Sequence, residues 1–310
     1  MLRKLAGLSL GTSTVRRVTE AAGRTVGERI AAGRTFGARV PWDWHRDRHG
    51  RTVAYTSVDA TGLGMQAGRG GKAEGRMAWI GMVYNPPPPV AEPPEPARRH
   101  EVMMARYLAG LNTLEELGGP LRRTAAQVGM EQAEVWIALT DGGSGLEEFM
   151  RSNFGRPDLV LILDFWHAAQ HLAELARALY GGDEARVQAA LGSWRHTLKH
   201  EGGEPLLAAL AELEQRDGDG WAAVQREAWE GETGYFRRNV GRMGYPAYEA
   251  NGWHIGSGPV ESACKTVIGQ RMKGGGMRWG EDGGDAVCHL RALFKSEGDG
   301  WDAFWARSIN

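Results

Sequence analysis

The chain has 310 residues, of which 42% are hydrophobic and 24% charged, values that are typical of a folded globular protein and exclude a fully disordered chain. Its length suffices for about two domains or for one domain with a large insertion. No apolar run reaches the ~18 residues that span a bilayer, no N-terminal signal region is visible, and two cysteines are too few for a disulfide framework. We therefore expect a cytoplasmic protein.

The net charge of −1 is unevenly distributed along the chain. Residues 1–51 contain eleven Arg or Lys side chains and four acidic ones, which leaves +7 there and −8 on the other 259 residues. Such asymmetry indicates a segment that binds a polyanion, although a merely solvated basic surface has the same composition.

Within this basic segment, residues 12–19 predict a helix in which Val15 and Val18 face inward, with a cap at Thr12 or Ser13. Two interpretations are open. The helix is either the second, recognition helix of a truncated helix-turn-helix, which would bring Arg16 and Arg17 to DNA, or a simple basic amphipathic helix.

Strands are predicted at several places in the next hundred residues. One over 53–58 ends at Asp59, a short one follows near 63–66, and a clear one covers 77–84. Apolar runs over 135–140 and 159–163 end at Asp141 and Asp164, respectively.

Helical spacing is found over 97–117, over most of Phe165 to about Val240, from about Pro259, and over 284–297. Three strands followed by alternating helices and strands predict an α/β fold with an RNase H-like mixed sheet. We expect four parts: a basic helical DNA-binding segment (1–51), the first part of the core (52–164), a helical insertion domain (165–250) and the C-terminal helices of the core (251–310).

Carboxylates at the predicted strand ends suggest a metal site. Hard cations such as Mg²⁺ prefer carboxylate oxygens, and two ions ~3.5–4 Å apart are well served by a bridging carboxylate. Asp59 and Asp141 are candidates, and Glu261, at a predicted helix onset after Pro259, is the best candidate for a third ligand. Alternatively, Glu261 stabilises a helix N-terminus.

Five short sequence blocks occur in order between about residues 50 and 305. They are Ser57–Gly62 (SVDATG), Thr140–Gly143 (TDGG), Leu163–Ala168 (LDFWHA), Gly256–Ser262 (GSGPVES) and Gly276–Trp279 (GMRW). With these blocks the chain resembles the bacterial insertion-sequence transposases of the ISKra group, which are related to Mutator-like transposases and have an Asp-Asp-Glu site.

The resemblance implies a DNA transposase that cleaves and transfers strands with two Mg²⁺ or Mn²⁺ ions. It implies Asp59, Asp141 and Glu261 as catalytic metal ligands. Asp164 and His167 match an Asp/Cys-x-x-His signature and take a supporting role, although the choice between Asp141 and Asp164 as second ligand stays open. The alternative is a catalytically inactive or domesticated DNA-binding protein that retains the transposase fold.

Partners and location follow from the same resemblance. It implies binding of terminal inverted repeats and target DNA by a homodimer or a larger assembly associated with the nucleoid, and an N-terminal DNA-binding region shorter than in the family. We expect Lys265, Arg271, Lys273 and Arg278 to contact DNA near the cut, with a solvated helix end and loop as the alternative.

Histidine pairs raise a different possibility. His167 and His171 are four residues apart on a predicted helix, as are His196 and His200, and such pairs can bind zinc, with Asp164 as a further ligand of the first pair. No glutamate lies between His167 and His171, so the metalloprotease motif is absent, and the carboxylate site is preferred over a zinc hydrolase.

Overall fold

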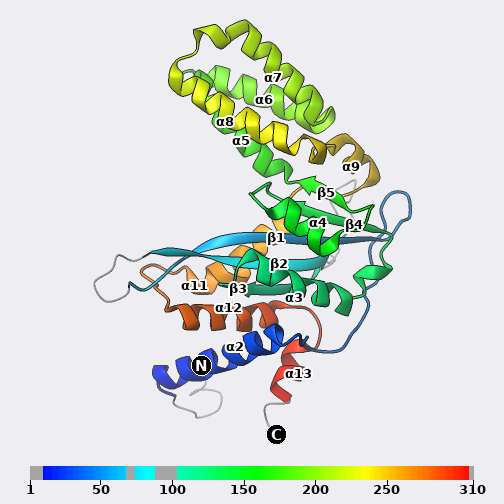
Figure 1. The fold of residues 1–310 in the computed structure, drawn as a ribbon, viewed down its shortest axis with the longest axis vertical. Coiled ribbons are helices and arrows are strands. Elements are labelled where there is room, and N and C mark those ends of the chain that lie inside the picture. Colours follow the sequence, from blue (N-terminus) through cyan, green and yellow to red (C-terminus); the bar gives the residue numbers. More distant parts are fainter. Residues whose placement is uncertain (1–9, 68–73, 88–102, 307–310) are drawn as a thin grey trace, which may run out of the picture.

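The computed structural model describes residues 10–67, 74–87 and 103–306, and it is a mixed α/β fold around a five-stranded sheet (Figure 1). The strands are β1 (Val53–Gly64), β2 (Gly75–Asn85), β3 (Met104–Gly110), β4 (Val135–Thr140) and β5 (Val160–Leu163). Their order is β3-β2-β1-β4-β5. The pairs β3–β2 and β2–β1 are antiparallel, whereas β1–β4 and β4–β5 are parallel. The long strand β1 is therefore central and flanked on both sides.

Helices cover both faces of the sheet. On one face, α3 (Leu114–Gln127) and α4 (Leu146–Phe154) pack with Trp42 and Trp44 against alternate residues of β1, such as Ala54. The other face is covered by α10 (Gly258–Ala263) and α12 (Glu281–Lys295), while α5 (Phe165–Tyr180) follows β5 and extends away from the sheet (Figure 1). Because both faces are apolar and buried, the strands have nearly continuous hydrophobic sequences.

A group of helices stands apart from the sheet at the top of Figure 1. It consists of α5, α6 (Glu184–His200), α7 (Gly203–Asp217) and α8 (Ala223–Asn239), each packed on its neighbours. We call α5–α8 the helical segment. Tyr235 of α8 ties this segment to the sheet by donating its hydroxyl to the carbonyl of Asp141 at 2.9 Å, and Tyr245, which follows the segment in the chain, donates to the carbonyl of Leu163 at 3.0 Å.

Shorter elements complete the chain. They are the 3₁₀ turns η1 (Met130–Gln132), η2 (Gly218–Gly220) and η3 (Val240–Arg242), the helices α9 (Tyr245–Asn251), α11 (Gln270–Met272) and α13 (Gly300–Ala306), and the π-helix η4 (Cys264–Gly269). In the part of the chain that the structure describes, no helix is both long and apolar enough to cross a membrane.

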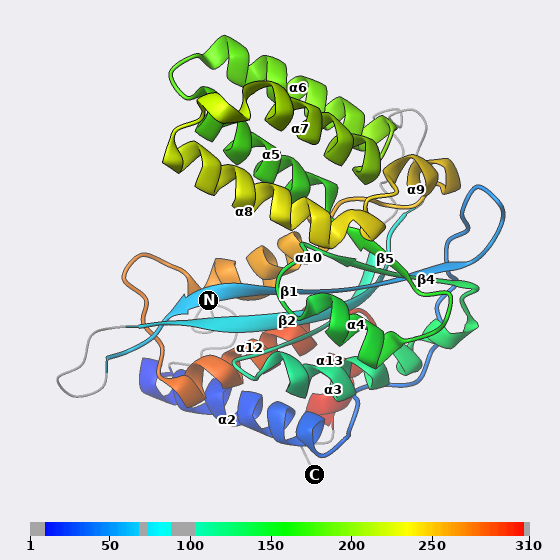
Figure 2. The ribbon, with the colours of Figure 1, turned by 45° about the horizontal axis from the view of Figure 1, so that its top comes forward.

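The N-terminal helix α2 (Thr12–Ala31) packs along α12, so helices from the first and last parts of the described chain lie side by side (Figures 1 and 2). The contact is closest at Gly23, where an added Cβ would lie 2.0 Å from the carbonyl oxygen of Ala286. Val26 of α2 packs with Leu290 and Leu293 of α12 and with α13. The basic N-terminal helix is therefore an integral layer of the fold.

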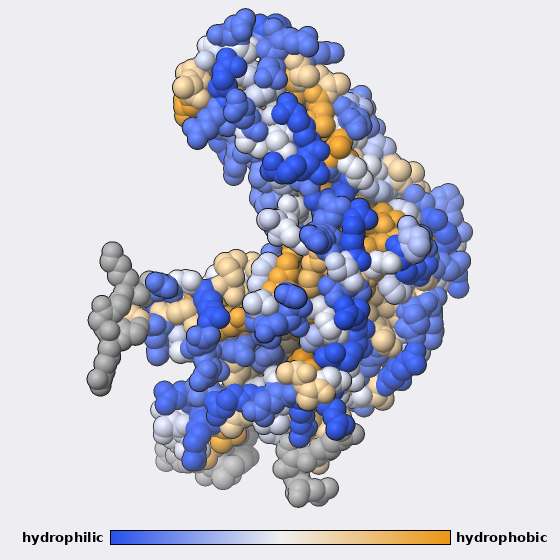
Figure 3. Space-filling model, viewed as in Figure 1, coloured by the Kyte–Doolittle hydropathy of each residue, from blue (hydrophilic) through white to orange (hydrophobic). Residues whose placement is uncertain are grey.

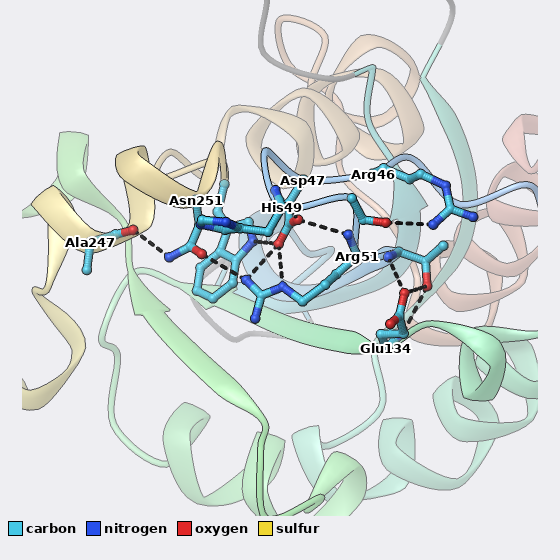
Figure 4. Close-up of polar contacts among 10 residues, drawn as sticks. Arg46, Asp47, His49, Arg51, Glu134, Ala247 and Asn251 are labelled. Atoms are coloured by element: carbon cyan, nitrogen blue, oxygen red, sulfur yellow. Dashed lines mark hydrogen bonds and ion pairs between the residues drawn. The ribbon is translucent and has the colours of Figure 1, made fainter.

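A buried aspartate connects the segment before β1 to α9 (Figure 4). Asp47 accepts hydrogen bonds from the backbone amides of His49 and Arg51 and from the Arg51 guanidinium. Arg51 also donates to Asn251 at 2.8 Å. Burial opposes ionisation of Asp47, but these hydrogen bonds outweigh it and hold its pKa below the usual value.

Several predicted elements are confirmed and others are wrong. The strands over 77–84, 135–140 and 159–163 are β2, β4 and β5. The strand predicted to end at Asp59 continues to Gly64, so Asp59 lies within β1. Residues 63 and 64 of the short strand expected near 63–66 are the end of β1. The pairing with β2, which reaches Gly75, extends the strand beyond its apolar first half.

The helix predicted over 97–117 is wrong. Residues 97–102 lie outside the described part of the chain, Met104–Gly110 is β3, and the helix α3 begins only at Leu114. Strand β3 pairs with β2 and packs against α12, and its apolar residues accumulate on both faces. Periodicity alone cannot distinguish such a strand from a buried helix.

The orientation predicted for the N-terminal helix is also wrong. Val15 and Val18 are 46% and 52% exposed, and the buried residues of α2 are Gly23 and Val26, further along the helix. The N-cap is Gly11, without a side-chain hydrogen bond. The expected first helix of a helix-turn-helix falls on residues 1–9, outside the described residues.

The contact at Gly23 yields a test of the α2–α12 packing. A Gly23→Ala substitution is expected to lower the free energy of unfolding by about 1–3 kcal/mol, because the methyl group meets backbone atoms that cannot move aside. Gly231→Ala, at an exposed position of α8 with no atom within 4 Å, should instead raise it by about 0.5–1 kcal/mol. Urea unfolding followed by circular dichroism measures both. Equal effects would contradict the packing described.

Candidate active site

Three aspartates lie in one row across the parallel strands. Ser57 of β1 pairs with Leu139 of β4, an offset of 82 residues, and the same offset separates Asp59 from Asp141. Pairs of β4 and β5 are offset by 23 residues, which is the separation of Asp141 and Asp164. Since neighbouring strands lie about 4.8 Å apart, the register places the three residues side by side at one level of the sheet.

Asp59 occupies the β1 end of this row and is half-buried. Its Oδ1 accepts a hydrogen bond from the Ala60 amide at 2.6 Å, and its Oδ2 accepts one from the Cys264 thiol at 3.3 Å. Burial raises the pKa of Asp59, and the negative charges of Asp141 and Glu261 raise it further against the effect of these hydrogen bonds. Asp141 and Glu261 are therefore both close enough to Asp59 to act on it electrostatically.

Asp164, at the other end of the row, is buried and occupied by protein partners. Its Oδ1 accepts from the Trp166 amide at 2.8 Å and so caps α5, while its Oδ2 accepts from the Ser257 hydroxyl. Burial raises the pKa of Asp164, and Glu261 contributes to the rise. Asp141 is more exposed and accepts only from the Gly143 amide, at 2.8 Å. These environments favour Asp141 over Asp164 as a metal ligand.

Glu261 reaches the row from α10, which packs against β1 and β2 (Figure 2). Its side chain is exposed, and its Oε1 accepts a hydrogen bond of 2.8 Å from the Ser257 hydroxyl. The Ser257 Oγ thus lies within hydrogen-bond distance of both Glu261 and Asp164, and its single proton is donated to one of them at a time. Glu261 lies in the first turn of α10, which is also the position that the alternative role, stabilisation of a helix N-terminus by its charge, requires.

The acids of this group lack ion-pair partners within the described chain, where no Lys or Arg pairs with Asp59, Asp141, Asp164 or Glu261. Partly buried carboxylates without a counter-charge are costly. An all-oxygen, anionic donor set is what Mg²⁺ and Mn²⁺ prefer, and the site therefore fits these ions chemically.

The spacing of the carboxylates restricts how ions could bind. Among the described residues, only one trio of His, Cys, Asp or Glu has donor atoms that all lie within 4.8 Å of one another, and it consists of His171, Glu174 and Glu232. The donor atoms of Asp59, Asp141 and Glu261 therefore do not all lie within that distance of one another. A single ion held by all three carboxylates is excluded as they stand, whereas two ions that share Asp59 require no such convergence.

Two of the basic residues predicted to contact DNA lie along the far half of β1. The Lys273 ammonium donates to the Thr61 hydroxyl, and Arg278 lies against Gly64, where an added Cβ would meet its guanidinium at 2.9 Å. Lys273 also acts electrostatically on Cys264, the thiol that contacts Asp59. A positive edge therefore borders the acidic row.

The other predicted DNA contacts are exposed side chains of α2, η4 and α11. Arg16 of α2 and Arg271 of α11 line one cavity of about 600 Å³ together with Trp279, although Arg16 also lies 3.9 Å from Glu20. Arg17 and Lys265 are exposed as well. Arg17, Lys265 and Arg271 form no ion pair with a described carboxylate.

His167, to which the sequence assigned a supporting role, follows Asp164 on α5 but is directed elsewhere. Its Nε2 lies 3.3 Å from Nε2 of His171, and within the described residues no hydrogen bond joins it to Asp59, Asp141 or Glu261. The structure thus places Asp141 and Glu261 where they act electrostatically on Asp59, without convergence of all three within 4.8 Å, and leaves His167 in a second group of side chains at the base of the helical segment.

Comparison with known proteins does not identify a family. A scan against models of protein families and a search of curated proteins both found no match. The site is therefore interpreted from its own residues and geometry.

Sequence reasoning assigned no function to three residues that contact the site. Ser257 holds Glu261 and Asp164, Cys264 holds Asp59, and Tyr235 binds the Asp141 carbonyl. Burial raises the pKa of the Cys264 thiol far above its ordinary value, so it remains a neutral donor. The one available signal was helical spacing, since Cys264 follows Glu261 by three residues and shares its face.

The raised pKa of Asp59 predicts a pH-dependent effect of Asp59→Asn on stability. Ionisation of Asp59 costs folding free energy above the pKa of the unfolded chain, ~3.9. At pH 7 without divalent cations, the variant should therefore be more stable than the wild type. This advantage should disappear as the pH falls through the raised value of the folded state. Urea unfolding at a series of pH values in EDTA measures the difference.

Asp158→Asn provides the control for this experiment. Arg156 lowers the pKa of the exposed Asp158, so loss of its charge should leave stability unchanged or slightly reduced at pH 7. A wild type that is more stable than Asp59→Asn at pH 7, by an amount independent of pH, would refute the electrostatic description of the site.

Proposed function

We propose that this protein is a DNA transposase of the Asp-Asp-Glu class, similar to the ISKra group, which cleaves and transfers DNA strands with two divalent cations. The observation that carries the proposal is the approach of Asp59, Asp141 and Glu261 from β1, the end of β4 and α10, where Asp141 and Glu261 act electrostatically on Asp59 and no described Lys or Arg forms an ion pair with the three acids. These residues are also the ones that the resemblance assigns as catalytic.

The topology supports this assignment. A sheet of order β3-β2-β1-β4-β5 with one antiparallel half and one parallel half is the arrangement expected of an RNase H-like core. The helical segment α5–α8 lies between β5 and α10 in the chain, where the long spacing from Asp141 to Glu261 predicts an insertion domain. We interpret the fold in this way.

The chemistry of such a site is phosphoryl transfer. Bound Mg²⁺ or Mn²⁺ ions would lower the proton affinity of an attacking water or DNA 3′-hydroxyl and stabilise the leaving 3′-oxygen. Asp59, Asp141 and Glu261 would hold them. The Cys264 thiol and the Ala60 amide orient Asp59, and the Ser257 hydroxyl orients Glu261 against the buried Asp164. Such outer contacts fix the directions of ligand oxygens.

The surroundings of the site suit a polyanion. The basic side chains Lys273 and Arg278 border the acidic row along β1, and their charges can bind phosphates on either side of a scissile bond. Figure 3 shows the molecule hollowed between the helical segment and the part that contains the sheet. We propose that DNA enters this hollow and is held there by backbone contacts.

Substitution of the ligands tests the catalytic role. Asp59→Asn and Glu261→Gln should each reduce cation-dependent nicking and joining by more than about a hundredfold, since even outer-shell partners of metal ligands contribute 10–100-fold. DNA affinity should not fall, because each change removes a negative charge. The substrate is a supercoiled plasmid that carries the gene with its flanking genomic DNA, incubated with Mg²⁺ or Mn²⁺.

Glu204→Gln is the matched control, because Glu204 is also an exposed glutamate in the first turn of a helix, α7. It should cleave like the wild type. Cleavage by Asp59→Asn and Glu261→Gln at the wild-type rate would refute the site. DNA binding without cleavage by any form of the protein would instead support the inactive DNA-binding alternative.

The positive edge formed by Lys273 and Arg278, together with the nearby Arg271, predicts how DNA binding depends on salt. Each of Arg271→Gln, Lys273→Gln and Arg278→Gln should reduce the slope of log K against log salt by about 0.9 if it removes one phosphate contact. Arg151→Gln on α4, an arginine paired with Glu147 at 2.8 Å, should leave the slope unchanged. Fluorescence anisotropy over a salt series measures these slopes, and equal slopes for all four variants would contradict the positive edge.

Point variants are preferable here to removal of residues 1–51. That deletion would also remove Trp42 and Trp44 from the core and α2 from its packing with α12. A lower DNA affinity of the deletion variant would then reflect unfolding as well as the loss of positive charge.

A further inference from the structure

Two imidazoles at the base of the helical segment are directed at the same point. His167 and His171 are one turn apart on α5, their Nε2 atoms are 3.3 Å apart, and their ring planes are at 80°. In a tetrahedral zinc site with Zn–N bonds of about 2.0–2.1 Å, two ligand nitrogens lie roughly 3.3 Å apart. The same separation is long for a hydrogen bond between two nitrogens.

Glu232 of α8 sets the tautomer of His171. Its Oε2 lies 2.6 Å from Nδ1 of His171, and because a carboxylate accepts, Nδ1 carries the proton and Nε2 presents a lone pair toward His167. Metal-ligating histidines almost always donate their second ring nitrogen to such a carboxylate or to a carbonyl. Tyr235 stacks on the His171 ring with centroids 3.7 Å apart, which fixes its orientation.

The charge around the pair favours a cation. One donor atom from each of His171, Glu174 and Glu232 lies within 4.8 Å of the other two. No described Lys or Arg forms an ion pair with Glu174 or Glu232. The side chains of His171 and Glu232 are 24% and 18% exposed, so the group is accessible from solvent but partly shielded from it.

We propose that His167 and His171 bind a transition-metal ion of the Zn²⁺ type through their Nε2 atoms, with Glu232 as the outer partner and water in the remaining positions. Two neutral imidazoles suit Zn²⁺, Ni²⁺ or Cu²⁺, whereas the all-oxygen site around Asp59 suits Mg²⁺ or Mn²⁺. The two sites therefore select different ions, and the second does not depend on the proposed function.

The position of this site gives it a structural consequence. Both proposed ligands lie on α5, and the hydrogen bond from His171 to Glu232 connects them to α8. Tyr235 of α8 stacks on His171 and donates its hydroxyl to the Asp141 carbonyl. A metal ion there would brace the base of the helical segment next to the acidic row.

The test is direct binding of Zn²⁺ to the full chain by isothermal titration calorimetry, in excess Mg²⁺ to occupy the carboxylate site. One equivalent should bind, and His167→Asn and His171→Asn should each weaken binding by more than about tenfold. Glu232→Gln keeps the size of the side chain and should weaken it by about 10–100-fold, as outer-shell substitutions do. Bound Zn²⁺ should also raise the melting temperature of the wild type but not of His171→Asn.

The second histidine pair supplies the matched control. His196 and His200 on α6 have the same spacing, with ring centroids 4.6 Å apart, but no described carboxylate is hydrogen-bonded to either ring. His196→Asn should therefore bind Zn²⁺ like the wild type. No binding by the wild type, unchanged binding by His167→Asn and His171→Asn, or an equal loss in His196→Asn would each overturn the proposal. Circular dichroism verifies that each variant is folded.

Discussion

The pairing of β1 with strands on both of its sides is the constraint on which the rest of the structure depends. Backbone hydrogen bonds to β2 and β4 leave β1 no freedom to slip, because a shift of one residue would turn Tyr55 and its apolar neighbours out of the core. Continued past the paired residues, the same register places Asp59 beside Asp141 and Asp141 beside Asp164. The acidic row is thus a by-product of the pairing that buries the core.

The position of this row has a free-energy cost that the surrounding residues only partly offset. Ser257, Cys264 and the amides of Ala60 and Trp166 donate to these carboxylates, yet burial still raises the pKa of Asp59 and Asp164. Elsewhere, the buried Asp47 is fully compensated by Arg51 and its pKa is lowered. The contrast supports the proposal that the row binds an external cation, because strongly perturbed carboxylates without an ion-pair partner are more often found at functional sites.

Much of the fold was predictable from local pattern, and the failures have physical causes. Strands β4 and β5 were recognised because each is a short apolar run with a clear end, whereas β3 was mistaken for a helix because burial on both faces removes the alternation that marks a strand. Val15 and Val18 were expected inside, but α2 meets α12 through glycine and Val26 further along. The candidate ligands were predictable as residue types, while the links through Ser257 and Glu232 depend on distant segments that no local pattern connects.

The glycine contact between α2 and α12 bears on how the molecule would handle a long, stiff ligand. Backbone packed that tightly does not slide, so α2 keeps a fixed position relative to α12 and to the sheet that α12 covers. Under the proposed function, a duplex bound at α2 would reach the carboxylates after a fixed number of base pairs. The distance along the DNA would then set the position of cleavage.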